Sequence, residues 1–133
     1  MAGICDLIFG KDREIVYWVQ KQLGMKDLEV PASGMGFAKD GELIGGAIYF
    51  NFREDDVEMG VATISPHWAS RRSLKAMFGY PFDLLGADRI TVYIKQDNAK
   101  SRDRAERLGF VREGMKRPDV IMYGMLKSEC KWL

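Results

Sequence analysis

The side chains best suited to moving a proton are one histidine and several carboxylates. His67 is the only histidine, and an imidazole suits a general base near neutral pH. A lone histidine beside a tryptophan in a loop is, however, more often structural. The acidic candidates for a general base are Glu58, Asp55, Asp56 and Glu113. Strand alternation places Glu58 on one face with Gly60 and Ala62, where it either lines a site or faces solvent.

A basic group, Arg71, Arg72 and Lys75, follows a strand pattern and opens a helical one. A guanidinium forms charge-assisted hydrogen bonds to phosphate oxygens, so the two arginines are candidates for binding an anion. The alternative interpretation is a solvated helix face, which fits Lys75 about as well. Both interpretations place the group at the start of a helix.

The elements that position these side chains follow from the spacing of apolar residues. A helix is expected over residues 12–23, with Asp12 as its N-terminal cap and Gly24 at its end. A three-stranded antiparallel meander is expected next. Its strands are residues 36–38, 43–52 and 57–64. The sequence Asp40-Gly41 between the first two is a strong hairpin signal.

The second half of the chain alternates helices and strands. A helix is expected over 70–85, although Gly79 and Pro81 predict a bend in its last turn. A strand over 89–95, a helix from Asn98 to Leu108 closed by Gly109, and final strands at 111 and 120–126 complete the pattern. The strand-helix-strand unit in the middle is long enough for a right-handed parallel crossover. The order predicts an α+β fold with a mixed sheet.

Composition is that of one ordinary globular domain over residues 1–133, because 47% hydrophobic and 29% charged residues favour a packed core. A net charge of +1 gives no reason to expect a nucleic-acid partner. Cys5 and Cys130 are interpreted as free thiols, since the chain has too few histidines for a zinc site or a catalytic Cys–His pair. Neither a signal-peptide pattern nor a membrane-spanning apolar stretch is present. We therefore expect a cytoplasmic protein.

The segment 97–114, DNAKSRDRAERLGFVREG, resembles the N-x-x-S…L-G-F-x-x-E-G signature of the GCN5-related N-acetyltransferases (GNAT). That signature belongs to the branch containing the ribosomal-protein N-terminal acetyltransferases. Residues 82–92, FDLLGADRITV, and 119–126, DVIMYGML, look like the approach to the fifth strand and the last strand of that branch. The resemblance covers roughly residues 34–130 and its asparagine-to-glycine segment is fairly specific.

The resemblance implies a GNAT-like, mostly antiparallel sheet of about six or seven strands with about three helices, whose fourth and fifth strands splay apart. It implies acetyl-CoA as co-substrate, with the pantetheine arm lying between those strands. The fourth strand is residues 57–64 here. Backbone groups around 59–64, with Ala62, Thr63 and Ile64 as binding residues, are the expected contacts of the arm and the oxyanion donor.

The resemblance also places the cofactor's pyrophosphate at the N-terminus of the next helix. The family uses a glycine-containing loop there, whereas this chain has Pro66-His-Trp-Ala-Ser-Arg-Arg-Ser73 without glycine. We expect Arg71 and Arg72, with Ser73, to bind the diphosphate in place of the glycines. The alternative is a degenerate site in a protein with another role.

The catalytic roles are likewise carried over from the family. Asn98 is expected to hydrogen-bond the pantetheine arm while also capping its helix. Ser101 is expected to give a proton to the departing thiolate, because Ala105 stands where many relatives have a tyrosine; Tyr123 or water are the alternatives. Glu58 is the first candidate for the general base. No metal is expected.

The resulting hypothesis is an N-acetyltransferase that transfers acetyl from acetyl-CoA to a primary amine of a protein, peptide or small molecule in a ternary complex. Two alternatives stay open. One is a nonenzymatic GNAT-fold protein, and the other is an enzyme using another acyl donor. Neither a nucleic-acid nor a membrane partner is expected, and the apolar segment 122–133 is compatible with a homodimer.

Overall fold

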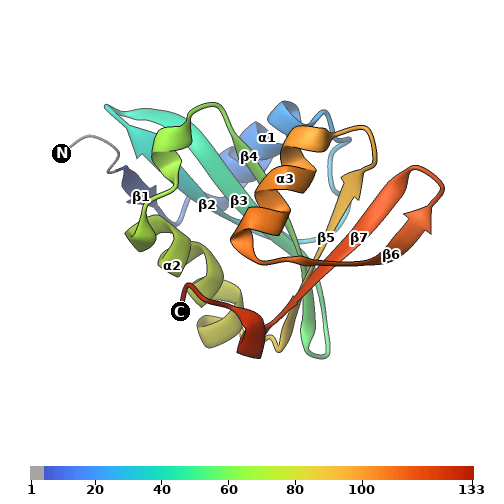
Figure 1. Ribbon diagram of the computed structural model, residues 1–133. Coiled ribbons are helices and arrows are strands. Elements are labelled where there is room, and N and C mark those ends of the chain that lie inside the picture. Colours follow the sequence, from blue (N-terminus) through green and yellow to red (C-terminus); the bar gives the residue numbers. More distant parts are fainter. Residues whose placement is uncertain (1–4) are drawn as a thin grey trace.

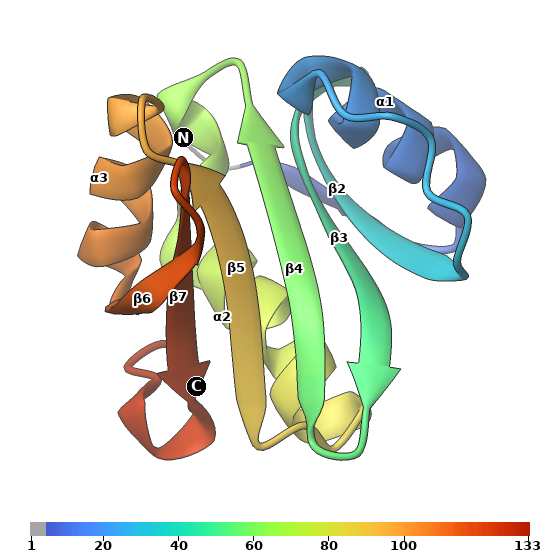
Figure 2. The ribbon, with the colours of Figure 1, turned by 90° about the vertical axis from the view of Figure 1, so that its right-hand side faces the viewer.

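The computed structural model describes residues 5–133, which form a seven-stranded sheet in the order β1-β2-β3-β4-β5-β7-β6. Helix α1 covers one face, and α2 and α3 cover the other (Figures 1 and 2). The elements are β1 (Asp6–Ile8), α1 (Asp12–Leu23), β2 (Ala32–Lys39), β3 (Glu42–Arg53), β4 (Asp56–Thr63), α2 (Arg71–Gly79), β5 (Arg89–Lys95), α3 (Ala99–Leu108), β6 (Val111–Arg117) and β7 (Val120–Leu126). All neighbouring strands pair antiparallel except β4 and β5.

Local sequence signals explain most of the boundaries. Asp40 and Gly41 both have positive φ, 52° and 82°, which is the backbone of the tight hairpin that joins β2 to β3. Gly24 and Gly109 end α1 and α3 in the left-handed conformation. The parallel crossover from β4 through α2 to β5 is confirmed. The α+β fold with a mixed sheet is therefore the observed one.

Several elements differ from expectation. The first strand of the meander, predicted over 36–38, is the longer β2, Ala32–Lys39, because its pairing with β3 continues back to Ala32. Asp12 does not cap α1; its carboxylate instead accepts a hydrogen bond from the Gly34 amide at 3.0 Å and ties the helix start to β2. The helix predicted over 70–85 is α2 followed by a π-helical turn, Tyr80–Leu84, because Pro81 cannot continue regular α-helical bonding. The three-residue strand β1 was not predicted, since it is too short to show alternation.

Two glycines bring α1 close to the sheet. A Cβ built on Gly46 would lie 2.7 Å from Val19 Cγ2, and one on Gly34 would lie 2.9 Å from Ile15 Cγ2. Ile15 and Val19 are fully buried against Ile48 of β3. The helix can pack at this distance only because the strands present no side chain there.

An ion pair on the α1 side of the sheet crosses β7. Arg89 of β5 donates from Nη1 to Glu113 Oε2 of β6 at 2.9 Å, and its Nη2 pairs with Oε1. Gly124 of β7 lies between them, and a Cβ at that position would collide with both side chains. The pair lowers the pKa of Glu113, chiefly through the hydrogen bond from Arg89. It ties β6 to the centre of the sheet.

Strands β4 and β5 separate after a short stretch of pairing. Only residues 56–58 of β4 pair with residues 89–91 of β5. Beyond Glu58 the two strands diverge, as Figure 1 shows. The predicted splay of the fourth and fifth strands is thus present.

Among the described residues, no helix is long and apolar enough to cross a membrane.

Candidate functional site

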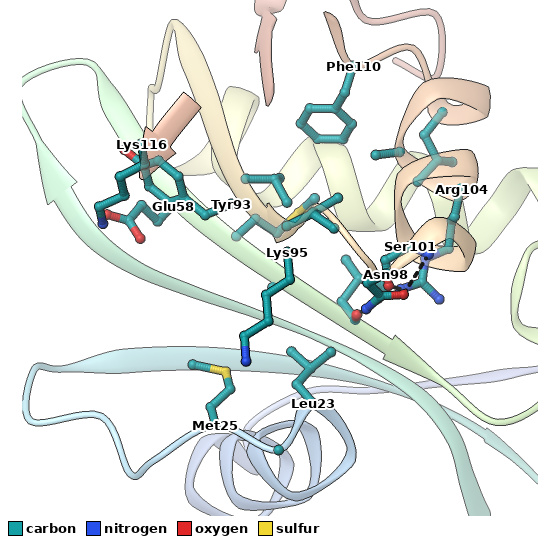
Figure 3. Close-up of a pocket in the computed structure, with 18 of the residues that line it drawn as sticks. Leu23, Met25, Glu58, Tyr93, Lys95, Asn98, Ser101, Arg104, Phe110 and Lys116 are labelled. Atoms are coloured by element: carbon teal, nitrogen blue, oxygen red, sulfur yellow. Dashed lines mark hydrogen bonds between the residues drawn. The ribbon is translucent and has the colours of Figure 1, made fainter. Parts of the chain in front are cut away.

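A groove of about 480 Å³ occupies the splay between β4 and β5 (Figure 3). The strands contribute its floor, α3 one wall and the end of α1 the other. Its lining residues are Leu23, Gly24, Met25, Phe50, Glu58, Met59, Gly60, Val61, Val92, Tyr93, Ile94, Lys95, Asn98, Ser101, Arg104, Ala105, Leu108, Phe110 and Lys116. Three residues predicted for the site, Glu58, Asn98 and Ser101, therefore meet in one groove.

Beyond its pairing with β5, the edge of β4 presents backbone groups to the groove. Hydrogen bonds show which residues face the groove: Asp55 O accepts from the Arg89 amide on β5, and Val61 O accepts from Arg104 on α3. The amide of Ile64 points the other way and donates to Ile44 O at 2.9 Å. Because backbone direction alternates along a strand, residues 59, 61 and 63 face the groove.

This alternation refines the three strand residues predicted to bind the cofactor. The backbone groups of Ala62 and Ile64 face β3, so neither can pair with a ligand in the splay. The backbone groups of Thr63 do face the groove side, although Thr63 lies beyond the groove lining. Its hydroxyl donates a hydrogen bond to Ser65 O at 2.6 Å. Within the predicted range 59–64, the groove-facing amides are those of Met59 and Val61, which the narrower choice of Ala62, Thr63 and Ile64 left out.

The N-terminal turn of α3 forms one wall. Asn98 caps the helix, with its Oδ1 accepting the Ser101 amide at 3.1 Å. The cap leaves the Asn98 side-chain NH₂ without a partner among residues 5–133. Ser101 Oγ lies 3.5 Å from an Nη2 of Arg104, one turn further along the helix. Amide, hydroxyl and guanidinium thus line the same side of the groove.

Glu58 is held in position at the base of the splay. Its Oε1 accepts a hydrogen bond from Asn51 Nδ2 at 3.2 Å. Asn51 has φ of 51° at an irregularity where β3 loses register with β4, and asparagine tolerates this left-handed conformation better than most residues. Tyr93 lines the groove nearby, and its pKa is raised by burial first and then by the charges of Glu58 and Asp56.

The other predicted bases lie outside the groove or are already paired. Asp56 accepts from Thr91 Oγ1 at 2.8 Å, and Glu113 is paired with Arg89. His67 is exposed in a short 3₁₀ turn, residues 66–68. These three side chains lie outside the groove lining. Within the described part of the chain, Glu58 is the one carboxylate in the lining.

Tyr123, an alternative proton donor, is likewise absent from the lining. Its ring is fully buried, and its hydroxyl donates to Glu106 Oε2 at 2.8 Å. Burial and that hydrogen bond raise its pKa. A tyrosine whose hydroxyl is hydrogen-bonded to the Glu106 carboxylate, outside the lining, does not serve the groove.

The start of α2 lies apart from the groove lining. Ser73 is fully buried in a reciprocal cap with Ser70, so its side chain is not available to a ligand. Arg72 Nη1 donates to Cys5 O at 3.2 Å and holds the N-terminal segment. Arg71 is exposed and, among residues 5–133, forms no ion pair. Arg71 and the first backbone amides of α2 remain as hydrogen-bond donors for an anion.

Four charged or polar lining residues were not predicted from the sequence: Tyr93, Lys95, Arg104 and Lys116. Spacing could have found Arg104, which stands three residues after Ser101 on the same helix face. Tyr93 and Lys95 share a face of β5 by alternation, and Lys116 Nζ lies 4.2 Å from the centre of the Tyr93 ring. Among residues 5–133, no cluster of His, Cys, Asp or Glu could hold a metal ion.

A family model for the acetyltransferase (GNAT) domain matches residues 10–111. The chain belongs to the GNAT family. This match spans α1, the splay and all of α3, which are the elements that build the groove. No curated protein matches the sequence.

Solved structures give the same fold. A putative acetyltransferase from T. thermophilus is 24% identical with a TM-score of 0.64, over 84% of this chain and 65% of that chain. The ribosomal-protein-S5-alanine acetyltransferase from Vibrio fischeri is 20% identical with a TM-score of 0.63, over 75% of this chain and 64% of that one. The chain therefore spans about two thirds of these two proteins.

A third structure bears on the ligand. The Campylobacter jejuni N-acetyltransferase PseH, solved in complex with acetyl coenzyme A, is 14% identical with a TM-score of 0.59, over 86% of this chain and 79% of that chain. At this identity the likeness concerns the fold. It shows that a similar GNAT fold accommodates acetyl coenzyme A.

Proposed function

We propose that the protein is an N-acetyltransferase that moves acetyl from acetyl-CoA to a primary amine by direct attack in a ternary complex. The observation that carries the proposal is the groove in the splay, which combines an open strand edge, one carboxylate without an ion pair among the described residues, and a polar helix wall. Family membership supplies the reaction class. The residues of the groove supply its parts.

The groove reaches both faces of the sheet, which suits a reaction between two ligands. Glu58 and Gly60 point to the α1 face, where a Cβ on Gly60 would contact Leu23. Met59 points to the opposite face, where it belongs to the core beneath α2 and α3. We assign the acyl donor to the α3 side and the amine to the α1 side, so that they meet in the splay.

The α3 side fits an extended amide-containing arm. The groove-facing backbone of Met59 and Val61 can pair with such an arm as an added strand does. Asn98 contributes a side-chain amide from the opposite wall. At the outer end, Arg71 and the free amides at the start of α2 would attract the diphosphate. The residues present therefore fit acetyl-CoA.

The chemical step needs a base, an oxyanion donor and help for the leaving thiolate. Glu58, which accepts a hydrogen bond from Asn51, would take a proton from the amine as it attacks the thioester carbon. A groove-facing amide of β4 would stabilise the oxyanion. Ser101 would donate a hydrogen bond to the sulfur as the carbon–sulfur bond breaks.

Release of free CoA thiol in the presence of an amine panel tests the proposal. The panel should contain peptides, amino sugars and polyamines, with reactions lacking amine as blanks. Amine-dependent thiol release that falls about 10²-fold in Ser101→Ala, with little change in acetyl-CoA affinity, is expected. No release with any amine, from protein that is folded, contradicts the proposal.

A further inference from the structure

Arg104 is the one arginine that lines the groove within the described chain. It lies on α3, one helical turn beyond Ser101, and its Nη2 donates to Val61 O across the splay at 3.0 Å. The same nitrogen is 3.5 Å from Ser101 Oγ (Figure 3). The positive charge of Arg104 thus lies beside Ser101, the predicted proton donor. It also lies at Val61 O, which faces the side assigned to the acyl donor.

The environment of this guanidinium is unfavourable for a charge. Burial lowers the pKa of Arg104. Among residues 5–133 it forms no ion pair with a carboxylate. A partly buried cation without a carboxylate partner destabilises a fold unless an anion arrives to pair with it. The unpaired charge therefore indicates an anionic ligand or intermediate in the groove.

Most N–H groups of the Arg104 guanidinium have no partner among residues 5–133. Arginine has five N–H donors in a rigid fork, and the two contacts within the protein come from a single terminal nitrogen. The other titratable groups of the lining, Glu58, Tyr93, Lys95 and Lys116, gather on the α1 face. Arg104 is therefore the cation on the side assigned to the acyl donor.

The leaving group of the proposed reaction creates the matching anion. A serine hydroxyl is a weaker acid than a thiol, so Ser101 can hydrogen-bond a departing sulfur but is not acidic enough to hold it protonated. A fixed cation stabilises the thiolate directly. We propose, given the function above, that Arg104 is a catalytic residue whose guanidinium pairs with the thiolate of CoA as it leaves.

The step is balanced without a further reagent. The amine nitrogen forms a bond to the thioester carbon, and its proton passes to Glu58. The carbon–sulfur bond then breaks, and its electron pair remains on sulfur as the thiolate. Arg104 keeps its own protons and pairs with that thiolate, while Ser101 donates a hydrogen bond to it. After release the thiolate takes a proton from solvent, and Glu58 returns its proton to solvent, which restores the enzyme.

Binding of free CoA, compared with acetyl-CoA, tests this pairing without knowledge of the acceptor. Only CoA carries an ionisable thiol; the thiol of cysteine, for comparison, has an ordinary pKa of about 8.5. A neighbouring guanidinium favours the thiolate, so the affinity for CoA rises with pH until the free thiol is ionised and then levels off. Dividing by the affinity for acetyl-CoA at each pH cancels titration of the protein's own groups.

Calorimetry over roughly pH 6.5–9.5 should give an affinity ratio that rises about tenfold or more in the wild type, as one charge-assisted bond implies. Arg104→Gln should give a flat ratio, because glutamine keeps an N–H for Val61 O but not the charge. Arg104→Lys should restore part of the rise. Lys95→Gln is the matched control and should behave as the wild type, since it removes a groove cation on the other face.

The outcomes separate this inference from the proposed function. A wild type that binds neither ligand overturns both. A wild type that binds acetyl-CoA with a pH-independent ratio, or an Arg104→Gln protein that keeps the full rise, overturns only the role of Arg104. A melting temperature of Arg104→Gln that falls while its ratio stays like the wild type's identifies a purely structural clamp between α3 and β4.

Discussion

Gly46→Ala tests the close packing that positions the α1 wall of the groove. The new Cβ would lie 2.7 Å from Val19 Cγ2 and 3.4 Å from Ile15 Cγ2. Val19 is fully buried and, as a β-branched residue in a helix, has few alternative rotamers. The clash is therefore relieved by moving α1, and overpacking of this kind costs about 1–3 kcal/mol.

That cost corresponds to a measurable change in thermal stability. For a chain of 133 residues the entropy of unfolding is roughly 280 cal/mol/K, so Gly46→Ala should lower the melting temperature by about 4–11 °C. Val19→Ala alone should destabilise by leaving a cavity. In the double mutant the two costs should partly cancel, because the alanine at 46 occupies the space that Val19 vacates.

Gly114→Ala is the matched control. Gly114 lies on a strand as Gly46 does, but an added Cβ meets no atom within 4 Å and its φ is not positive. Its stability should stay the same or rise by roughly 0.4–1 kcal/mol. Calorimetric melting of the wild type and these four variants gives the comparison. An unchanged melting temperature for Gly46→Ala, or strictly additive costs in the double mutant, refutes the packing argument.

Asn51→Gly keeps the left-handed backbone but removes the amide that orients Glu58, so amine-dependent turnover should fall about tenfold without loss of melting temperature. Glu58→Gln should flatten the acidic limb of the pH–rate profile; retention of that limb excludes it as the base. Arg71→Ala should weaken acetyl-CoA binding about 10- to 100-fold, whereas Arg72→Ala should mainly lower stability through loss of the Cys5 contact. The lowered pKa of Glu113 means its ion pair stabilises the fold above its unfolded pKa, about 4.3, and is lost as pH falls through the folded value. Melting temperatures of Glu113→Gln should therefore fall less than the wild type's below that pH.

Short-range signals explain why much of the fold was predictable. Asp40-Gly41 needs two consecutive positive φ values, and few other pairs supply them. Asn98 and Gly109 bracket α3 with a cap at each end. These residues determine local backbone geometry by themselves, so no knowledge of the tertiary structure is needed to read them.

Features in which another contact engages the side chain or amide were missed. Asp12 looks like a helix cap, but its best donor is the Gly34 amide, 22 residues away. Ser73 looks available at a helix start, but the Ser70 hydroxyl captures its amide. In both cases a tertiary or local contact competes with the role that sequence position indicates.

The site was predictable in part for the same reason. The motif spacing predicted Asn98 and Ser101 as site residues, and strand position predicted Glu58. All three line the groove. The direction of each backbone amide on β4 depends on its register with β3, which sequence does not specify, so Ala62 and Ile64 were chosen without this constraint. The groove lining, rather than any motif, identifies the further polar residues.

Titration of acetyl-CoA into the wild-type protein tests the central claim most directly. A groove that binds the co-substrate should give a saturable heat with a dissociation constant in the micromolar range. At millimolar acetyl-CoA the protein should then gain about 4 kcal/mol of stability, seen as a raised melting temperature. Absence of both heat and thermal stabilisation at that concentration contradicts the assignment of this groove as an acetyltransferase site.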